Sequence, residues 1–479
     1  MTVPVEHGSN HAVIEAAVAR KEATLTYFLT FQGTLLCAAV EAGVLALVQR
    51  PVAAVGNDAQ PVVVDMPVEQ LRPGFDQFLT NAPPTLDRAV QFGRFGTVRL
   101  GRAKDQRCVT LTWQGQFLSA FTDGRIVTGA DLGDWEGFLP ISATELEMLR
   151  QILTNDWIIR SSGALVRAGS VALEHWYTLR LGDLKLDLRD QLPFDAAHWP
   201  FRLTVLQDGW RIEQLCLYRP LIYFTAFNSP TVLSQFYISI RSLRELGQYR
   251  GRILLITDRP RDEIVANLPS AVADQLDLVH LAPNDQAGFV AARFKILDLD
   301  WAARFQPVMY MDADLVFDTA IEPMLCAVAR SDQLSAPLEP FSPMRSAPCA
   351  GSGLIQLEGL SPGFAVGFNF GTVGIPNLPA HASTLRLIRT IMMTHAALHG
   401  RTALGWLEQE VANYVSFRLT PFGPAINPFV RYGGWPNTEP STDGRVGLVH
   451  FWPALDAEAK LAAMQSYRHR IDAAIAAPG

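Results

Sequence analysis

The sequence predicts two architectures in one chain: an all-β repeat domain followed by an α/β domain with a mostly parallel sheet. In the first half, short apolar runs alternate with glycine turns in a unit of about 40 residues. This pattern is typical of strands, because glycine adopts the positive φ that tight turns require. From about Leu215, apolar runs alternate with amphipathic segments, as in a sheet covered by helices. A length of 479 residues also favours two or three domains.

Composition excludes several classes of protein. A net charge of -7 argues against a nucleic-acid-binding protein, because such proteins usually carry an excess of positive charge. Five cysteines without a CxxC pair predict reduced thiols in a cytoplasmic protein, and no disulfide framework or zinc site. No run reaches the roughly 18 apolar residues of a membrane span, so we expect no transmembrane segment. The nearest run, residues 35–48, contains Glu41 and is predicted to be core. A peripheral association with a membrane stays open.

The first half repeats itself. "TFQGTLLCAA" (30–39) matches "TWQGQFLSAF" (112–121), and "DWIIRSSGALVRAG" (156–169) follows the same pattern. A four-strand unit of this length fits a β-trefoil or a propeller blade, and four to five units are too few for most propellers. "FLSAFTDGRIVTGADLGDWEGFLPI" resembles the repeats of fascin-like β-trefoils. We therefore predict a β-trefoil-like domain over 25–205, preceded by a tail over 1–24.

Trp135 and Trp176 occupy matching places in this repeat. We expect them and the neighbouring phenylalanines to be core residues, because large aromatic side chains dominate protein interiors. The alternative is that they form a surface that binds glycan or protein.

The second half alternates strands and helices. A strand is predicted within 215–229, and "GRILLIT" is a continuous apolar run of the kind that a doubly covered parallel strand shows. The predicted helices are 231–246, 262–276 and 288–305, and the further strands are 251–257, 277–283 and 307–312. In such sheets, ligands bind beyond the carboxyl ends of the strands.

Asp312 and Asp314 follow the last of these strands in "PVMYMDADLVF". Residues two apart on an extended chain point the same way, so both carboxylates can address one object. They repel each other unless a cation or a proton lies between them. Oxygen ligands suit Mg²⁺ or Mn²⁺, which complete their shells with substrate phosphates. The pair therefore predicts a metal-diphosphate site, in which both carboxylates face solvent when no ligand is bound.

This segment resembles glycosyltransferase family 8, the GT-A-fold group that includes glycogenin and the lipopolysaccharide galactosyltransferases. "YFTAFNSPTVLSQFYISIRSLREL", "GFNFGTVGI", "WLEQEVANYV" and "HFWPALDAEAK" are similar to further landmarks of the family, in its order. The likeness covers 218 to about 465, and we predict the domain as 212–479. It implies transfer of a sugar from a nucleotide-sugar, expected to be a UDP-sugar, with retention and with Mn²⁺ (or Mg²⁺). The acceptor would be a carbohydrate, a lipid-linked glycan or a protein.

The resemblance also implies roles for individual residues. Asp312, Asp314 and His450 would ligate the metal. Arg293 would contact the donor, and Asn369 would hold hydroxyl groups of the donor sugar. An alternative for His450 is a packed histidine at a strand end.

Further residues match the family's donor site. Thr225, Ala226 and Asn228 stand in the first strand element, which holds the nucleotide. Glu408 and Gln409 stand where the family has Asp-Gln beside the reacting face of the sugar, and the choice between them stays open. No carboxylate nucleophile stands out, which fits a front-face mechanism assisted by the donor's own phosphate.

The chain also departs from the family after His450 and in the "FNFG" element. The family has a lysine six residues after its histidine, whereas here Asp456 stands there and Lys460, the candidate for the diphosphate, comes later. Phe370 replaces a small hydroxyl residue, and we expect it to reshape the sugar pocket. A nucleotide-sugar pyrophosphorylase would need a Gly-rich loop after the first strand, which "IYFTAFNSP" lacks. The other alternative is a catalytically degenerate scaffold that binds glycan or protein.

Overall fold

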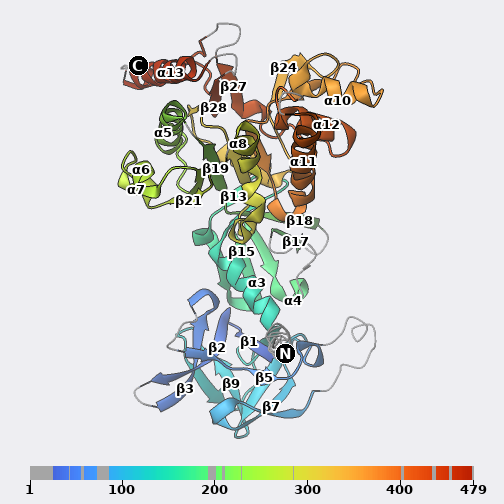
Figure 1. Ribbon diagram of the computed structural model, residues 1–479. Helices are drawn as coiled ribbons and strands as arrows, with labels where there is room; N and C mark the ends of the chain where they lie inside the picture. The colour runs from blue at the N-terminus through green and yellow to red at the C-terminus, as the bar shows by residue number, and fades with distance from the viewer. Residues whose placement is uncertain are drawn as a thin grey trace, which may run out of the picture. The chain divides into compact units, whose positions relative to one another are not determined.

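The computed structural model divides into two compact units, Met1–Leu215 and Cys216–Gly479 (Figure 1). It describes residues 25–41, 44–54, 59–72, 86–192, 201–207, 211–227, 229–283, 285–400, 404–433, 439–451 and 456–476. The predicted tail, 1–24, lies outside these residues. The predicted domain limits, 25–205 and 212–479, stay predictions.

The first unit is built around an 11-stranded sheet whose main path is β10-β9-β8-β11-β1-β2-β3. The strands of this path are β10 (Ile126–Gly129), β9 (Gln116–Ala120), β8 (Val109–Trp113), β11 (Phe138–Ser142), β1 (Leu25–Thr30), β2 (Thr34–Glu41) and β3 (Val44–Pro51). Four strands join it at the side: β4 (Ala59–Pro61), β5 (Val64–Asp65), β6 (Arg88–Gln91) and β7 (Thr97–Arg102).

The repeated segments form hairpins. β1–β2 and β8–β9 both turn at Gln-Gly, where Gly33 and Gly115 have φ of 74° and 82°. The two hairpins lie on either side of β11, which pairs with β1 and with β8. The third segment forms the hairpin β12 (Asp156–Ile159) and β13 (Leu165–Val166) in a separate sheet. This strand order does not show the threefold arrangement of a β-trefoil, which stays a prediction.

The first unit also contains helix α3 (Ala143–Thr154), so the expectation of an all-β half was incomplete. Ser142 and Glu145 form a capping box at its start, a signal that the sequence carries in "SATE". Arg72 pairs with Glu145 at 2.7 Å. The remaining elements are β14 (Val171–Glu174), β15 (Thr178–Leu181), β16 (Leu184–Asp187), α4 (Leu188–Gln191), β17 (Arg202–Gln207) and β18 (Arg211–Tyr218).

The aromatic residues of the first unit divide into two groups. Phe28, Phe138 and Trp157 are fully buried, as expected for core residues. Trp135 is 38% exposed, so the expectation that it belongs to the core was wrong. It packs edge-to-face on Phe121 at the surface. The side chain of Trp176 lies outside the described residues.

The second unit contains a five-stranded sheet in the order β21-β20-β19-β22-β26. Its strands are β21 (Leu276–His280), β20 (Arg252–Thr257), β19 (Leu221–Ala226), β22 (Val308–Met311) and β26 (Thr372–Ile375). The first three pairings are parallel and the last is antiparallel. The prediction of an α/β region with a mostly parallel sheet is confirmed.

The helices of this sheet differ from expectation in two places. α5 (Pro230–Glu245) forms as predicted and buries Leu233 and Phe236. The helix expected over 262–276 is two short ones, α6 (Arg261–Val265) and α7 (Ser270–Ala273), because Pro269 cannot continue a helix. The helix expected over 288–305 is α8 (Gln286–Ala291) followed by the 3₁₀ segments η6 (Ala292–Asp298) and η7 (Asp300–Arg304).

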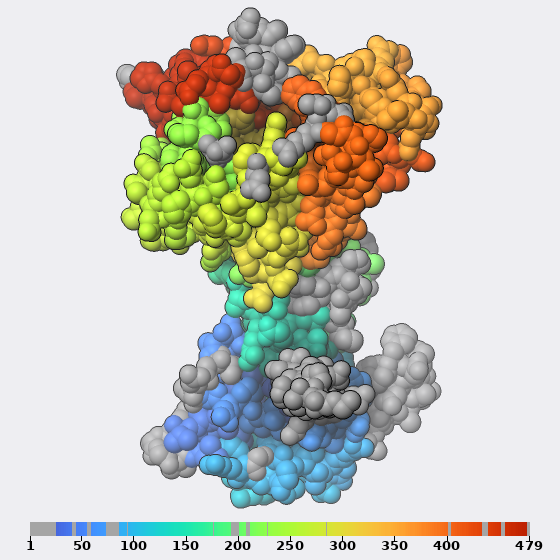
Figure 2. Space-filling model, viewed as in Figure 1, coloured from blue at the N-terminus to red at the C-terminus, as the bar shows by residue number. Residues whose placement is uncertain are grey.

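A second, three-stranded sheet follows the order β23-β28-β27. It joins β23 (Leu315–Phe317), β28 (Leu448–Phe451) and β27 (Val430–Gly433). Helix α13 (Ala457–Ala476) packs on this sheet through Met464, Tyr467 and Ile471. It also lies against α5, as Figures 1 and 2 show. The other elements here are α9 (Glu322–Arg330), β24 (Leu338–Pro343), α10 (Ser352–Leu357), β25 (Val366–Phe368), α11 (Leu378–His399) and α12 (Glu408–Arg418).

None of the helices in the described part of the chain has both the length and the apolar character needed to cross a bilayer.

Candidate metal centre and donor site

Asp312 and Asp314 lie at the carboxyl end of β22, in the short link to β23. The backbone N–H of Asp312 donates to the Gly371 carbonyl at 2.7 Å, next to β26. The carbonyl of Asp314 accepts from the Phe451 N–H at 3.1 Å, in β28. Between them, Ser239 of α5 donates its hydroxyl to the Ala313 carbonyl at 2.6 Å. Hydrogen bonds from three separate segments therefore hold the backbone of this link.

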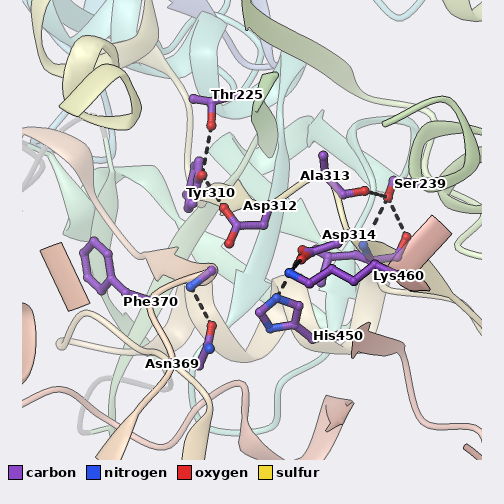
Figure 3. Close-up of polar contacts among 12 residues, drawn as sticks. Thr225, Ser239, Tyr310, Asp312, Ala313, Asp314, Asn369, Phe370, His450 and Lys460 are labelled. Atoms are coloured by element: carbon purple, nitrogen blue, oxygen red, sulfur yellow. Dashed lines mark hydrogen bonds and ion pairs between the residues drawn. The ribbon is translucent and has the colours of Figure 1, made fainter. Parts of the chain in front are cut away.

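His450 reaches the acids through strand pairing. β23 and β28 are antiparallel, and His450 pairs with Leu315, the residue after Asp314. Its Nε2 lies 3.2 Å from Asp314 Oδ1. One ligand atom from each of Asp312, Asp314 and His450 lies within 4.8 Å of the others (Figure 3). The structure thus brings together the three residues that the sequence predicts as metal ligands.

The expectation that both acids face solvent was wrong for Asp314. Asp314 is buried, at 8% exposure, because Lys460 in the first turn of α13 covers it. The Lys460 Nζ donates to Asp314 Oδ2 at 2.7 Å. The Asp312 side chain is 29% exposed. Lys460, predicted to bind the diphosphate, therefore lies at the metal centre itself.

The charges of the site compensate one another. Burial acts to raise the pKa of Asp314, but Lys460 and His450 outweigh it and hold this pKa below its usual range. Burial acts to lower the pKa of His450, and Asp314 reverses the effect, so the pKa is raised. Burial raises the pKa of Asp312, with Asp314 adding to the shift. Lys460 and His450 thus both stabilise the ionised form of Asp314.

Two observations test whether these residues fit a metal ion. A Cβ on Gly371 would collide with Asp312 Oδ2 and lie 2.7 Å from His450 Cε1 and 2.8 Å from Asn369 Oδ1, so glycine leaves the space between the ligands open. The His450 Nδ1 is buried and has no hydrogen-bond partner among the described residues. Oxygen and imidazole donors of this kind suit Mn²⁺. The residues fit a divalent ion, and they do not specify which one.

Arg293 and Glu408 form a buried ion pair beside Asp312. Arg293 Nη1 lies 2.6 Å from Glu408 Oε1, and its Nη2 lies 3.7 Å from Asp312 Oδ1. Arg293 also donates to the Phe370 carbonyl at 3.1 Å. Burial raises the pKa of Glu408 to about 7, although Arg293 opposes the shift. Arg293 lies in the 3₁₀ segment η6, within the range where a longer α-helix was predicted.

Glu339 is a buried acid that the sequence analysis missed. It accepts from Asn369 Nδ2 at 2.7 Å, from Gln409 Nε2 at 3.3 Å and from the Ser342 hydroxyl at 2.9 Å. It therefore joins two predicted donor-site residues, Asn369 and Gln409. Asn369 Oδ1 in turn accepts from the Gly371 N–H at 2.7 Å. A lone Glu in "LEPFSP" carried no signal, because only pairing of distant segments brings it here.

Phe370, expected to reshape the sugar pocket, has its side chain in the core. Its side chain is 2% exposed and belongs to a core cluster with Phe294, Phe368 and Phe422. Figure 3 shows its ring apart from the acids. The Phe370 N–H donates to Gln409 Oε1 at 3.3 Å, so the backbone takes part in the site whereas the ring packs away from it.

The predicted nucleotide residues lie at the end of β19. Thr225 Oγ1 is 3.0 Å from the Tyr310 hydroxyl, which donates to Asp312 Oδ1. Ala226 is buried. Asn228 lies outside the described residues. Tyr310 was missed, although it stands two residues before Asp312 on the same face of the strand, and that spacing could have indicated it.

No family model and no curated protein matches the sequence. Among solved structures, the chain is similar to the galactosyltransferase LgtC in complex with donor and acceptor sugar analogues. The identity is 16%, the match covers 54% of this chain and 97% of that chain, and the TM-score is 0.37. An active-site mutant of LgtC gives 16% identity, coverage of 51% and 95%, and a TM-score of 0.36. Likeness at this level decides nothing about activity, so the function below is derived from the contacts of the site.

Proposed function

We propose that the chain is a metal-dependent glycosyltransferase that moves a sugar from a nucleotide-sugar to an acceptor. The observation that carries this proposal is the convergence of Asp312, Asp314 and His450 around the space beside Gly371. The site lies at the carboxyl end of a mostly parallel sheet, where such folds bind ligands.

Asp312, Asp314 and His450 would hold a divalent ion, with Mn²⁺ or Mg²⁺ proposed. When bound there, such an ion supplies Lewis-acid stabilisation to the negative charge of a departing nucleoside diphosphate. Lys460 adds a positive charge at the same place, since its ammonium already lies 2.7 Å from Asp314. The side chain comes from the first turn of α13, and we propose that it contacts the diphosphate.

The sugar side of the site would be formed by Asn369, Gln409 and Glu339. These three are joined by hydrogen bonds, so a hydroxyl-binding surface would be pre-organised rather than assembled on binding. Glu408 is held by Arg293, and Glu339 accepts from three groups. Neither carboxylate is free to attack the donor in this arrangement. For the proposed retaining transfer, this favours the front-face route, in which the donor's own phosphate assists.

A UDP-sugar is the proposed donor, and the acceptor is proposed within the classes of carbohydrate, lipid-linked glycan or protein. The resemblance of "YFTAFNSP" and "GFNFG" to family 8 supports the donor class. The contacts of the described residues favour none of these three acceptor classes over the others.

The test is metal-dependent release of nucleoside diphosphate from a panel of UDP- and GDP-sugars. We expect turnover with Mn²⁺ in the full chain, and loss of it in Asp312→Asn and Asp314→Asn. Asp277→Asn, on edge strand β21, is the control and should keep full turnover. Normal Mn²⁺-dependent turnover in either metal-site variant would refute the site. Mn²⁺ binding without turnover on any donor would favour the degenerate scaffold instead.

A further inference from the structure

The two acids of the metal centre are held by different kinds of partner. Asp314 is held by the charged side chains of Lys460 and His450. Asp312 Oδ1 accepts from the Tyr310 hydroxyl, and the Thr225 hydroxyl lies 3.0 Å from Tyr310. Figure 3 shows Thr225, Tyr310 and Asp312 in a row, leading from the end of β19 to the metal centre.

The chemistry of the groups sets the direction of this chain of hydrogen bonds. The Tyr310 hydroxyl donates to Asp312 Oδ1, and a phenol has a single proton to donate. The proton of Tyr310 therefore points to Asp312, and the Thr225 hydroxyl donates to Tyr310. Each hydroxyl has one proton to donate, so the hydrogen bonds run in the order Thr225 to Tyr310 to Asp312.

The two oxygens of Asp312 consequently face different surroundings. Oδ1 is occupied by Tyr310, with Arg293 Nη2 3.7 Å away. Oδ2 faces the opposite side, because it is the oxygen that a Cβ on Gly371 would strike, together with His450. The hydrogen bond on one oxygen thus decides which oxygen faces the space between the ligands.

We propose that Tyr310, supported by Thr225, is the positioning residue that turns Asp312 Oδ2 toward the metal ion. This inference rests on the metal site of the proposed function. Packing fixes the hydroxyl: the Tyr310 ring is 1% exposed, lies 5.2 Å from the Tyr223 ring and has the Arg293 guanidinium over it at 4.6 Å. Partners of this kind orient metal ligands, and their loss typically weakens metal binding about tenfold to a hundredfold.

Tyr310→Phe removes only the hydroxyl and keeps the ring between Tyr223 and Arg293. The Asp312 carboxylate then loses this hydrogen bond and keeps the longer contact with the Arg293 guanidinium, at 3.7 Å. We expect the Kd for Mn²⁺ to rise about tenfold to a hundredfold. Thr225→Val should raise it less. The double variant should match Tyr310→Phe alone, because Thr225 acts through Tyr310 and the two effects are not additive.

The experiment is a titration of Mn²⁺ into the donor-free full chain, followed by electron paramagnetic resonance. Tyr223→Phe is the matched control: it is also a buried tyrosine, it pairs with Tyr310 across β19 and β22, and its hydroxyl donates to the Arg293 carbonyl at 3.0 Å. It should leave the Kd for Mn²⁺ unchanged. The spectrum of bound Mn²⁺ should change in Tyr310→Phe and not in Tyr223→Phe, because only the first alters the geometry of a ligand.

An unchanged Kd in Tyr310→Phe, or an equal rise in Tyr223→Phe, would overturn the inference and leave the metal site standing. A wild-type chain that binds no Mn²⁺ would overturn the proposed function as well. If Tyr310→Phe fails to fold, as judged by circular dichroism in chelator, Thr225→Val replaces it as the test. A Kd for Mn²⁺ in Thr225→Val equal to that of the wild type then overturns the inference.

Discussion

Lys460 occupies the place of a cation at Asp314, so its removal should strengthen metal binding by the donor-free protein. Its Nζ lies 2.7 Å from Asp314 Oδ2, and the two side chains are 16% and 11% exposed. A metal ion bound to Asp314 would be repelled by this ammonium, because both carry positive charge. In Lys460→Met the uncharged side chain offers no such competition.

The size of the effect follows from the burial of the pair. Two unit charges about 4 Å apart attract by about 4 kcal/mol at the effective dielectric constant of a protein surface. Part of this is cancelled, because a mostly buried pair has also lost its hydration. A net contribution of about 1.4 to 2.8 kcal/mol corresponds to a change of about tenfold to a hundredfold in an equilibrium constant. We therefore expect the Kd for Mn²⁺ to fall by about that factor in Lys460→Met.

The measurement is an Mn²⁺ titration of the donor-free full chain, with Lys460→Arg as the control that keeps a positive charge. The helix should stay in place in both variants, because Tyr467 donates to Asp318 at 2.9 Å and Arg468 pairs with Glu245 at 2.6 Å. Without metal, Lys460→Met should melt at a lower temperature, since Asp314 loses a partner, and added Mn²⁺ should reverse this loss.

Turnover is expected to move in the opposite direction from metal affinity. Under the proposed function, Lys460→Met loses the charge that would meet the diphosphate, so it should bind Mn²⁺ more tightly and release nucleoside diphosphate more slowly. The reasoning is refuted if Lys460→Met binds Mn²⁺ as weakly as the wild type or more weakly. In that case the lysine would support the site and would not compete for it.

Three further results are expected. Gly371→Ala should abolish Mn²⁺ binding because its Cβ would fill the space between the ligands, whereas Gly353→Ala, with no atom within 4 Å of its Cβ, should bind normally in the same titration. Asp314 raises the pKa of His450 in the folded protein. In the metal-free protein, His450 should therefore contribute a stabilisation that is fully present below pH about 6.5 and is lost as the pH rises through the folded-state pKa. Mn²⁺ affinity should change in the opposite direction and fall as pH is lowered through that pKa, because His450 must lose its proton before it can bind the ion. Thermal melts in chelator and Mn²⁺ titrations, each made across pH on the wild type and His450→Ala, check both expectations. A Kd for Mn²⁺ that does not depend on pH would contradict the role of His450 as a ligand. The fragment 219–479 should fold and keep its Mn²⁺ affinity, as judged by circular dichroism and titration, and aggregation of the fragment alone would show that the two units depend on each other.

Local patterns in the sequence predicted much of the framework. Alternation of apolar runs and amphipathic segments was enough for the parallel sheet and α5, because helix and strand periods are written in neighbouring residues. The "QG" repeats correspond to two hairpins on either side of β11. The placement of Asp312 and Asp314 at a strand end followed from "VMYMDAD" alone.

Local patterns were insufficient where a competing signal was overlooked. Pro269 divides an expected helix, and "SATE" starts the unexpected helix α3. Arg293, in the 3₁₀ segment η6, pairs with Glu408, which lies far away in the sequence.

The character of the site was decided by tertiary structure. The sequence by itself determined that two carboxylates would stand together beyond a parallel strand. Pairing of β23 with β28 decided that His450 joins them, and packing of α13 decided that Lys460 covers Asp314. Pairing of distant segments likewise placed Glu339 between Asn369 and Gln409. The physical reason is that the periodic pattern of a strand or a helix is visible in neighbouring residues of the sequence. The partner of a buried charge, in contrast, comes from whichever segment the whole fold brings within hydrogen-bond distance.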